Sequence, residues 1–279
     1  MLFAEFLANI PAVPRLLLAV ALTVGITLAF ARVFYSRSLL LSQQRPDAEE
    51  VVASDGATLK VPMTTDLVSR LLTFSNFAFV FLLGFTYSQF WSNVNTAAND
   101  NNTFTTSFVQ ASTITGDLPS GPARDILVSA FADYQIAVTE NQWPHLVMAD
   151  QDAASWVQYD AATSLLDAVK EASAVGATSA PSWGYIESAI NDMLDDAVDV
   201  IQAVPGHEAT SIILLIFLMG IANLALIAIF QVTRPGMYYL VLGILAGLTG
   251  AMFFMIVELS NPFAGATAVR PMLLDFPVF

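Results

Sequence analysis

The sequence predicts an all-α, polytopic membrane protein with four transmembrane helices and a helical extramembrane domain between the second and the third. Apolar residues make up 56% and charged residues only 12% of the 279-residue chain, so long stretches have no solvent-facing side. Four stretches reach the roughly 20 apolar residues that a bilayer crossing needs: 16–35, 71–90, 211–232 and 237–257. A long, more polar segment separates the second stretch from the third. These observations together define the predicted fold class.

The first predicted span, at 16–35, ends in "LAFAR", which has the small residues of a signal-peptide cleavage site. No basic cluster precedes it, and its apolar run is longer than that of a usual signal peptide, so we expect a retained span. The next residues form a loop, because Pro46, the Asp55-Gly56 pair and Pro62 favour turns. The predicted segments are the N-terminus with the first span (1–36), a short basic loop (37–65), the second span (66–94), an acidic helical domain (95–210), the third and fourth spans (211–258) and a C-terminal tail with an Asn-Pro-Phe motif (259–279).

The long domain has the apolar periodicity of helices. Leu127, Phe131 and Tyr134 recur at steps of three and four residues after Pro122, which the first turn of a helix tolerates. The residues after "APSW" repeat this pattern, and a third helix is expected at 153–172. We also expect the helices of the second and third spans to continue into this domain.

Charge distribution predicts the orientation of the chain. Between residues 95 and 210 there are sixteen acidic residues and two basic ones. Basic residues in or beside the two short loops are Arg32, Arg37, Arg45, Lys60, Arg70 and Arg234. The positive-inside rule therefore puts these loops in the cytoplasm, and the acidic domain and both termini on the extracytoplasmic side of an integral, multi-pass protein.

The same charges limit the partners. A net charge of −14 excludes nucleic acid as an expected partner. The acidic surface is either a solvated face or a vestibule that concentrates cations at a pore mouth.

Signals for enzyme chemistry are poor. His145 and His207 are far apart in the sequence, there is no cysteine, and no Gly-rich phosphate loop or Gly-x-Ser-x-Gly motif occurs. The acidic clusters lack the ligand spacing of an EF-hand. We therefore predict no catalytic residue, no metal site and no cofactor.

Aromatic residues recur at four-residue steps in the second span. Phe77, Phe81 and Phe85 share one helix face, which Gln89 and Asn93 continue. The phenylalanines either face lipid or the helix bundle, or several subunits contribute them to a central hole. In the second case they form a narrow dewetting constriction, and Gln89 and Asn93 form a wetter mouth.

Small and polar residues in the spans predict helix packing. Gly243, Gly247 and Gly250 follow each other at steps of four and three, which lets another helix approach closely, and Gly84 lies beside the phenylalanines. Asn223 is polar within the third span. It predicts an interhelical hydrogen bond, with pore lining as the alternative.

Two motifs resemble the bestrophins. "FLLGF" followed by "QFWSN" is similar to the second transmembrane helix of that family, and "ELSNPFAG" is similar to its Asn-Pro-Phe-Gly segment. The resemblance implies that Phe81 and Phe85 are neck phenylalanines, with Gly84 between them. It places Phe77 at the first neck position, which is aliphatic in animal bestrophins. The arrangement of the spans also resembles the uncharacterised bestrophin-like group of bacteria and plants.

The second motif gives the tail a structural role. We expect Asn261, Pro262 and Phe263 to brace the end of the fourth span against a neighbouring helix. Animal bestrophins continue there into an acidic calcium clasp, whereas this chain continues "ATAVRPML". The resemblance therefore does not imply activation by calcium.

The expected function is a homo-oligomeric ion channel in membrane lipid that conducts inorganic ions passively. The resemblance implies a pentamer and an anion such as chloride or bicarbonate, whereas the acidic domain favours cations if it lines the ion path. The alternative is a non-conducting scaffold or accessory subunit of a larger membrane complex. Bestrophins keep their termini and helical domain in the cytoplasm, and here we follow the charge rule instead.

Overall fold

A computed structural model describes the backbone of residues 12–43, 48–52, 58–62, 66–230, 235–265 and 268–275, and the side chains of residues 13–33, 70, 72–206, 209–228, 238–265 and 268–273. The chain folds into two compact units. The first unit is Met1–Gln89 with Thr210–Val257, and the second unit is Phe90–Ala209 with Glu258–Phe279. The segment 259–279, expected as a tail, thus clusters with the acidic domain.

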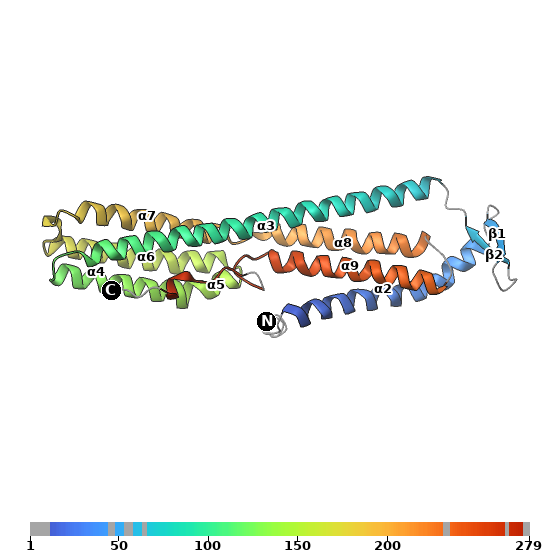
Figure 1. Cartoon of the computed structure of the whole chain (residues 1–279), viewed down its shortest axis with the longest axis horizontal. Coiled ribbons are helices and arrows are strands. Elements are labelled where there is room, and N and C mark those ends of the chain that lie inside the picture. The colour runs from blue at the N-terminus through green and yellow to red at the C-terminus, as the bar shows by residue number, and fades with distance from the viewer. Residues whose placement is uncertain are drawn as a thin grey trace. The chain divides into compact units, whose positions relative to one another are not determined.

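The second unit is a helical bundle. Its helices are the C-terminal part of α3 (Asp66–Gly116), α4 (Pro122–Ile136), α5 (Trp143–Val147), α6 (Gln151–Ala174) and α7 (Trp183–Gln202), with short helices η2 (Ala177–Ser179) and η3 (Met272–Asp275) (Figure 1). Helix α6 packs against both α4 and α7. The three helices predicted for the domain are confirmed.

An aromatic cluster fills the core of this bundle. Phe108 of α3 contacts Phe131 of α4 edge to face, with ring centroids 5.6 Å apart, and stacks on Tyr134 at 6.3 Å. Each fully buried side chain of this size contributes about 1.5–3 kcal/mol through removal of apolar surface from water. Of the six residues in the predicted stripe of α7, Leu194 is partly buried and the others are buried: Ile186, Ile190, Met193, Ala197 and Ile201.

A π-helical segment interrupts the helix that the sequence predicts after Pro122. It spans η1 (Ala137–Gln142) between α4 and α5. Pro144 is the second residue after it. A proline inside a helix has no N–H to donate to the carbonyl four residues earlier, and its ring clashes with that carbonyl. The wider π turn relieves this conflict, and the backbone N–H of Trp143 donates to the carbonyl of Val138, five residues earlier.

The first unit contains α2 (Ala12–Gln43), the N-terminal part of α3, α8 (His207–Phe230) and α9 (Pro235–Leu259) (Figure 1). Three stretches of the described residues are long and apolar enough to cross a membrane: Val13–Val33, Ala209–Ala228 and Tyr238–Leu259. These are consistent with an integral membrane protein. The expected span at 71–90 lies in α3 but is not among the three, so the count of four spans stays a prediction.

Two helices were expected to continue between a span and the acidic domain, and only one of them does. Helix α3 runs without interruption through the boundary between the units. Helix α7, in contrast, ends at Gln202, and α8 begins at His207. Pro205 and Gly206 lie in the gap, where proline lacks the N–H that a continuous helix needs. The expected continuous helix into the third span is therefore wrong.

Residues 37–65, expected as a loop, contain regular structure. Helix α2 continues to Gln43, and β1 (Ala48–Val52) pairs antiparallel with β2 (Thr58–Pro62) in the register Ala48 to Pro62 and Val52 to Thr58. Asp55 and Gly56 lie between the two strands, outside the described residues. An Asp-Gly pair between β-branched runs favours a hairpin, and this signal was available in the sequence.

Candidate functional site

The predicted neck residues lie on the exposed face of α3. In a single chain the exposed fractions of Phe77, Phe81 and Phe85 are 70%, 66% and 61%. The rings of Phe77 and Phe81 stack with centroids 6.4 Å apart and an interplanar angle of 19°. The stripe therefore turns away from the core of its own unit, and it is available to lipid or to a second copy of the chain.

The opposite face of α3 explains why the helix is held in this rotation. Phe79 and Leu83 are buried, and Phe79 lies against Phe253 of α9 with ring centroids 6.5 Å apart. A methyl group added to Gly220 of α8 would come within 3.2 Å of the Phe79 ring. Because this face packs against α8 and α9, the phenylalanine stripe cannot turn inward without breaking these contacts.

Sequence reasoning missed one member of the stripe. Phe74 is 71% exposed and precedes Phe77 by three residues, which a helix places on the same face. A repeat of exactly four residues does not include Phe74. We define the aromatic stripe as Phe74, Phe77, Phe81 and Phe85.

Polar contacts link α3 to α8 within the first unit. The amide of Asn223 donates to Asn76 Oδ1 at 2.6 Å, and the Ser75 hydroxyl donates to Asn223 Oδ1 at 3.2 Å. Asn223 itself is buried. It thus makes the interhelical hydrogen bonds that its position favours, and in hydrocarbon such bonds avoid the cost of unsatisfied polar groups.

The glycines of α9 differ from one another. A methyl group on Gly250 would lie 2.8 Å from Thr23 Oγ1 of α2, and one on Gly247 would lie 3.7 Å from Val24. For Gly243 and Gly84, no described atom lies within 4 Å of the same position. Close helix packing is therefore present at Gly247 and Gly250, whereas the described residues make no such contact at Gly84 and Gly243, where it stays a prediction.

The two residues predicted for the pore mouth, Gln89 and Asn93, are exposed. Asn93 lines a cavity of about 420 Å³ together with Thr96, Asp100 and Asp199. Burial, and then the neighbouring carboxylates of Asp199 and Asp196, raise the pKa of Asp100. The carboxylates of Asp100 and Asp199, which line this cavity, give it a negative potential.

The Asn-Pro-Phe segment caps α5. The amide of Asn261 donates to the carbonyls of Leu146 at 3.1 Å and Val147 at 2.9 Å, and its Oδ1 accepts from the Phe263 backbone N–H at 3.0 Å. Phe263 is 2% exposed and meets the Trp143 ring edge to face, with centroids 5.4 Å apart. The segment after α9 is thereby fixed to a helix end of the second unit. The sequence predicts a neighbouring helix as its partner but does not identify that helix as α5.

The end of α5 carries local strain. Ala149 has a φ of 56°, in the left-handed region that usually takes glycine. The N–H of Asp150 donates to the His145 carbonyl at 2.9 Å, and that of Ala149 to the Leu146 carbonyl at 3.1 Å. This is the pair of bonds of a Schellman motif, and Asn261 satisfies carbonyls at the same helix end.

Together these features define a helical protein with apolar helices long enough to cross a membrane, an exposed aromatic stripe and an acidic helical bundle. The chain belongs to the bestrophin-like family, because the family model of the bestrophin-like domain matches residues 46–274. This confirms the resemblance found in the sequence, and the match includes both the aromatic stripe and the Asn-Pro-Phe segment. No curated protein and no solved structure matches the chain.

Proposed function

We propose that this chain assembles with copies of itself into an ion channel whose pore is lined by the aromatic stripe of α3. The observation that carries the proposal is the exposure of Phe77, Phe81 and Phe85 in a single chain, on a helix whose other face is buried. In the proposal, residues 71–90 form the second of four spans. Membership of the bestrophin-like family supports this use of the stripe.

Several copies are needed because one helix face cannot surround a hole. Copies arranged around an axis would bring their stripes together and remove these large apolar side chains from contact with lipid or water. A pentamer is the arrangement that the resemblance to bestrophins implies. Gly84, which has no described atom of its own chain within 4 Å of an added methyl group, would then have its neighbour in another copy.

The conduction step in this proposal is passive. Rings of phenylalanine form an apolar constriction that excludes water when narrow, and ions pass when it is wet. Gln89 and Asn93 offer amide groups where an ion regains its hydration. Phenylalanine does not select the sign of the charge: the resemblance favours chloride or bicarbonate, and the sixteen carboxylates between residues 95 and 210 favour cations.

Cross-linking tests the geometry of this proposal. The native chain has no cysteine, so Phe85→Cys adds a single thiol without background. If the stripe faces a shared axis, oxidation or a short bis-thiol reagent should join the subunits of the purified protein through this thiol. Leu248→Cys is the matched control, because Leu248 is 57% exposed on α9; equal cross-linking at both positions, or none at Phe85, would refute a pore-facing stripe.

A non-conducting scaffold or accessory subunit is the second candidate. The specific observation in its favour is the excess of carboxylates on the second unit, which offers a surface to basic partners. The two candidates differ in what purification yields. A channel is isolated as a homo-oligomer, whereas an accessory subunit is isolated with a larger complex.

A further inference from the structure

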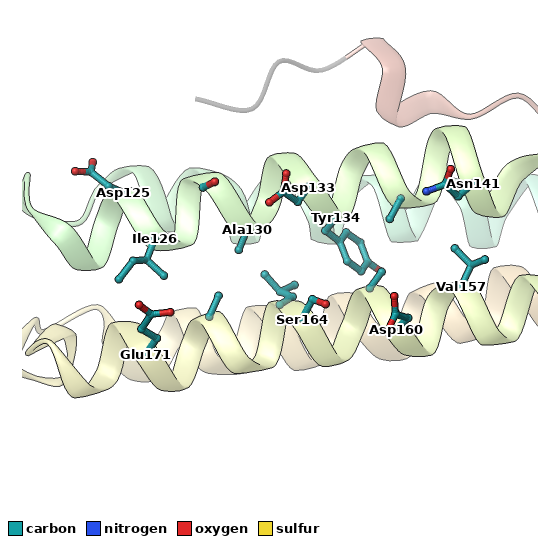
Figure 2. Close-up of a pocket in the computed structure, with 15 residues that line it drawn as sticks. Asp125, Ile126, Ala130, Asp133, Tyr134, Asn141, Val157, Asp160, Ser164 and Glu171 are labelled. Carbon is teal, nitrogen blue, oxygen red and sulfur yellow. The ribbon is translucent and has the colours of Figure 1, made fainter.

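A groove between α4 and α6 has an apolar floor and an acidic rim. It encloses about 800 Å³ and lies entirely within the second unit (Figure 2). Ile126, Ala130, Val157, Ala161 and Leu165 contribute to its floor. The rim carboxylates are exposed and come from both helices: Asp125 and Asp133 from α4, and Asp160 and Glu171 from α6.

The rim carboxylates extend over two to three helical turns on each side of the groove. Asp125 and Asp133 are two turns apart on α4, which is about 12 Å, and Asp160 and Glu171 are about 16 Å apart on α6. None of the fifteen residues that line the groove is basic. The nearby Lys170 donates to Asp167 at 2.7 Å, and neither residue lines the groove.

Small side chains leave room for a third helix in this groove. Ala130, Ala137, Ala161, Ser164 and Ala168 are among the residues that line it. Rows of small residues let the backbone of another helix approach closely, so that its side-chain ridge fills the space between two packed helices. The floor would bury an apolar face, and the rims would meet the flanks of the incoming helix.

A hydrogen bond holds the aromatic ring that lines the groove. The amide of Gln158 donates to the Tyr134 hydroxyl at 2.7 Å, and Tyr134 is part of the lining whereas Gln158 is not. Gln158 is 4% exposed, and among the described residues its Oε1 has no hydrogen-bond partner. Because Gln158 lies outside the lining, this acceptor belongs to the core of the bundle and is not part of the docking surface.

We propose that this groove docks a positively charged amphipathic helix of a partner protein, an inference that does not depend on the channel proposal. The apolar face of that helix lies on the floor, and its lysine or arginine side chains pair with the four rim carboxylates. A second copy of this domain is the wrong occupant, because it has sixteen acidic residues and two basic ones between residues 95 and 210 and would be repelled by the rim carboxylates. An anionic lipid surface is excluded for the same reason.

The test uses a fluorescein-labelled synthetic helix of about 18 leucine and lysine residues that is apolar on one face. Its binding to the full-length chain in detergent is measured by fluorescence anisotropy. The variant Asp133→Lys with Asp160→Lys should weaken binding more than about tenfold, because two attractions become repulsions. The matched control, Asp192→Lys with Asp195→Lys on exposed positions of α7, changes the net charge equally and should cost less than about threefold.

A variant without a charge change tests the shape of the groove. Ser164 is exposed, so Ser164→Trp should fill the groove, leave the fold intact by thermal midpoint and weaken binding. Equal losses in the two charge-reversal variants would overturn the proposal in favour of unspecific attraction. A peptide of the same composition with alternating leucine and lysine cannot form an amphipathic helix, and equal binding of this peptide would also overturn the proposal. Equally strong binding of spermine, in competition with the synthetic helix at equal concentration, would overturn it as well.

Discussion

Removing the Asn261 side chain should destabilise the second unit. In Asn261→Ala the carbonyls of Leu146 and Val147 lose their amide donor, and the Phe263 N–H loses its acceptor. The Asn-Pro-Phe segment then loses its attachment to α5. Phe263, which is 2% exposed, loses the contact that holds it against Trp143.

The expected size follows from the three hydrogen bonds. Each contributes about 0.5–1.5 kcal/mol, and a buried partner left unsatisfied costs about 1–3 kcal/mol. One bond is solvent-exposed and lies at the low end of this range. The loss is therefore about 2–3 kcal/mol, which for a unit of this size lowers the thermal midpoint by about 6–9 °C.

Tryptophan fluorescence measures this loss in the right part of the molecule. All four tryptophans, Trp91, Trp143, Trp156 and Trp183, belong to the second unit, so thermal unfolding followed by their emission reports that unit. Asn261→Asp keeps the acceptor but not the donors, and should be at least as destabilising. Asn191→Ala, an exposed position on α7, should change the midpoint by less than about 2 °C. A midpoint in Asn261→Ala equal to that of this control would refute the cap.

Three further predictions concern strain, charge and orientation. Ala149→Gly should raise the stability of the second unit by about 0.5–1 kcal/mol, because glycine adopts the left-handed conformation without cost; an unchanged or lower midpoint by tryptophan fluorescence would contradict this. Since the pKa of Asp100 is raised, its ionised form weakens the fold above that pKa. Asp100→Asn should therefore raise the midpoint at pH 7, and the gain should disappear below about pH 4, where the carboxyl is protonated in the folded and unfolded states; an equal gain at both pH values would rule out titration as its cause. In intact cells, a cysteine at exposed Thr178 should react with an impermeant maleimide, and one at Ser54, outside the described residues, should be protected; the reverse pattern would invert the orientation.

The sequence predicts the helices because their signal is local. The apolar residues of α7 recur every three or four positions, and the structure buries that stripe. The same logic identifies the exposed face of α3, since phenylalanines at four-residue spacing share a face wherever the helix lies. Ile126 and Ala130 belong to the predicted apolar stripe of α4 but are only partly buried, because they form the floor of the groove.

The features that sequence reasoning missed depend on contacts distant in sequence or on unusual backbone. Asn261 reaches carbonyls more than a hundred residues earlier, and no periodicity encodes that pairing. The π-helical segment before Pro144 follows from the cost of a proline in a helix, which the apolar pattern does not register. The hairpin differs, because Asp55-Gly56 favours a hairpin turn as well as an open loop, and only the flanking residues distinguish the two.

Ion flux through the purified oligomer tests the central claim most directly. In a planar bilayer under a salt gradient, we expect a current whose reversal potential gives the sign of the permeant ion. Phe81→Ala and Phe85→Ala should increase that current or its leak, because a wider and less apolar ring lowers the barrier to wetting, whereas Leu248→Ala should leave it unchanged. No current from folded protein across voltage, pH and calcium, or currents that neither phenylalanine variant alters, would contradict a pore lined by the aromatic stripe.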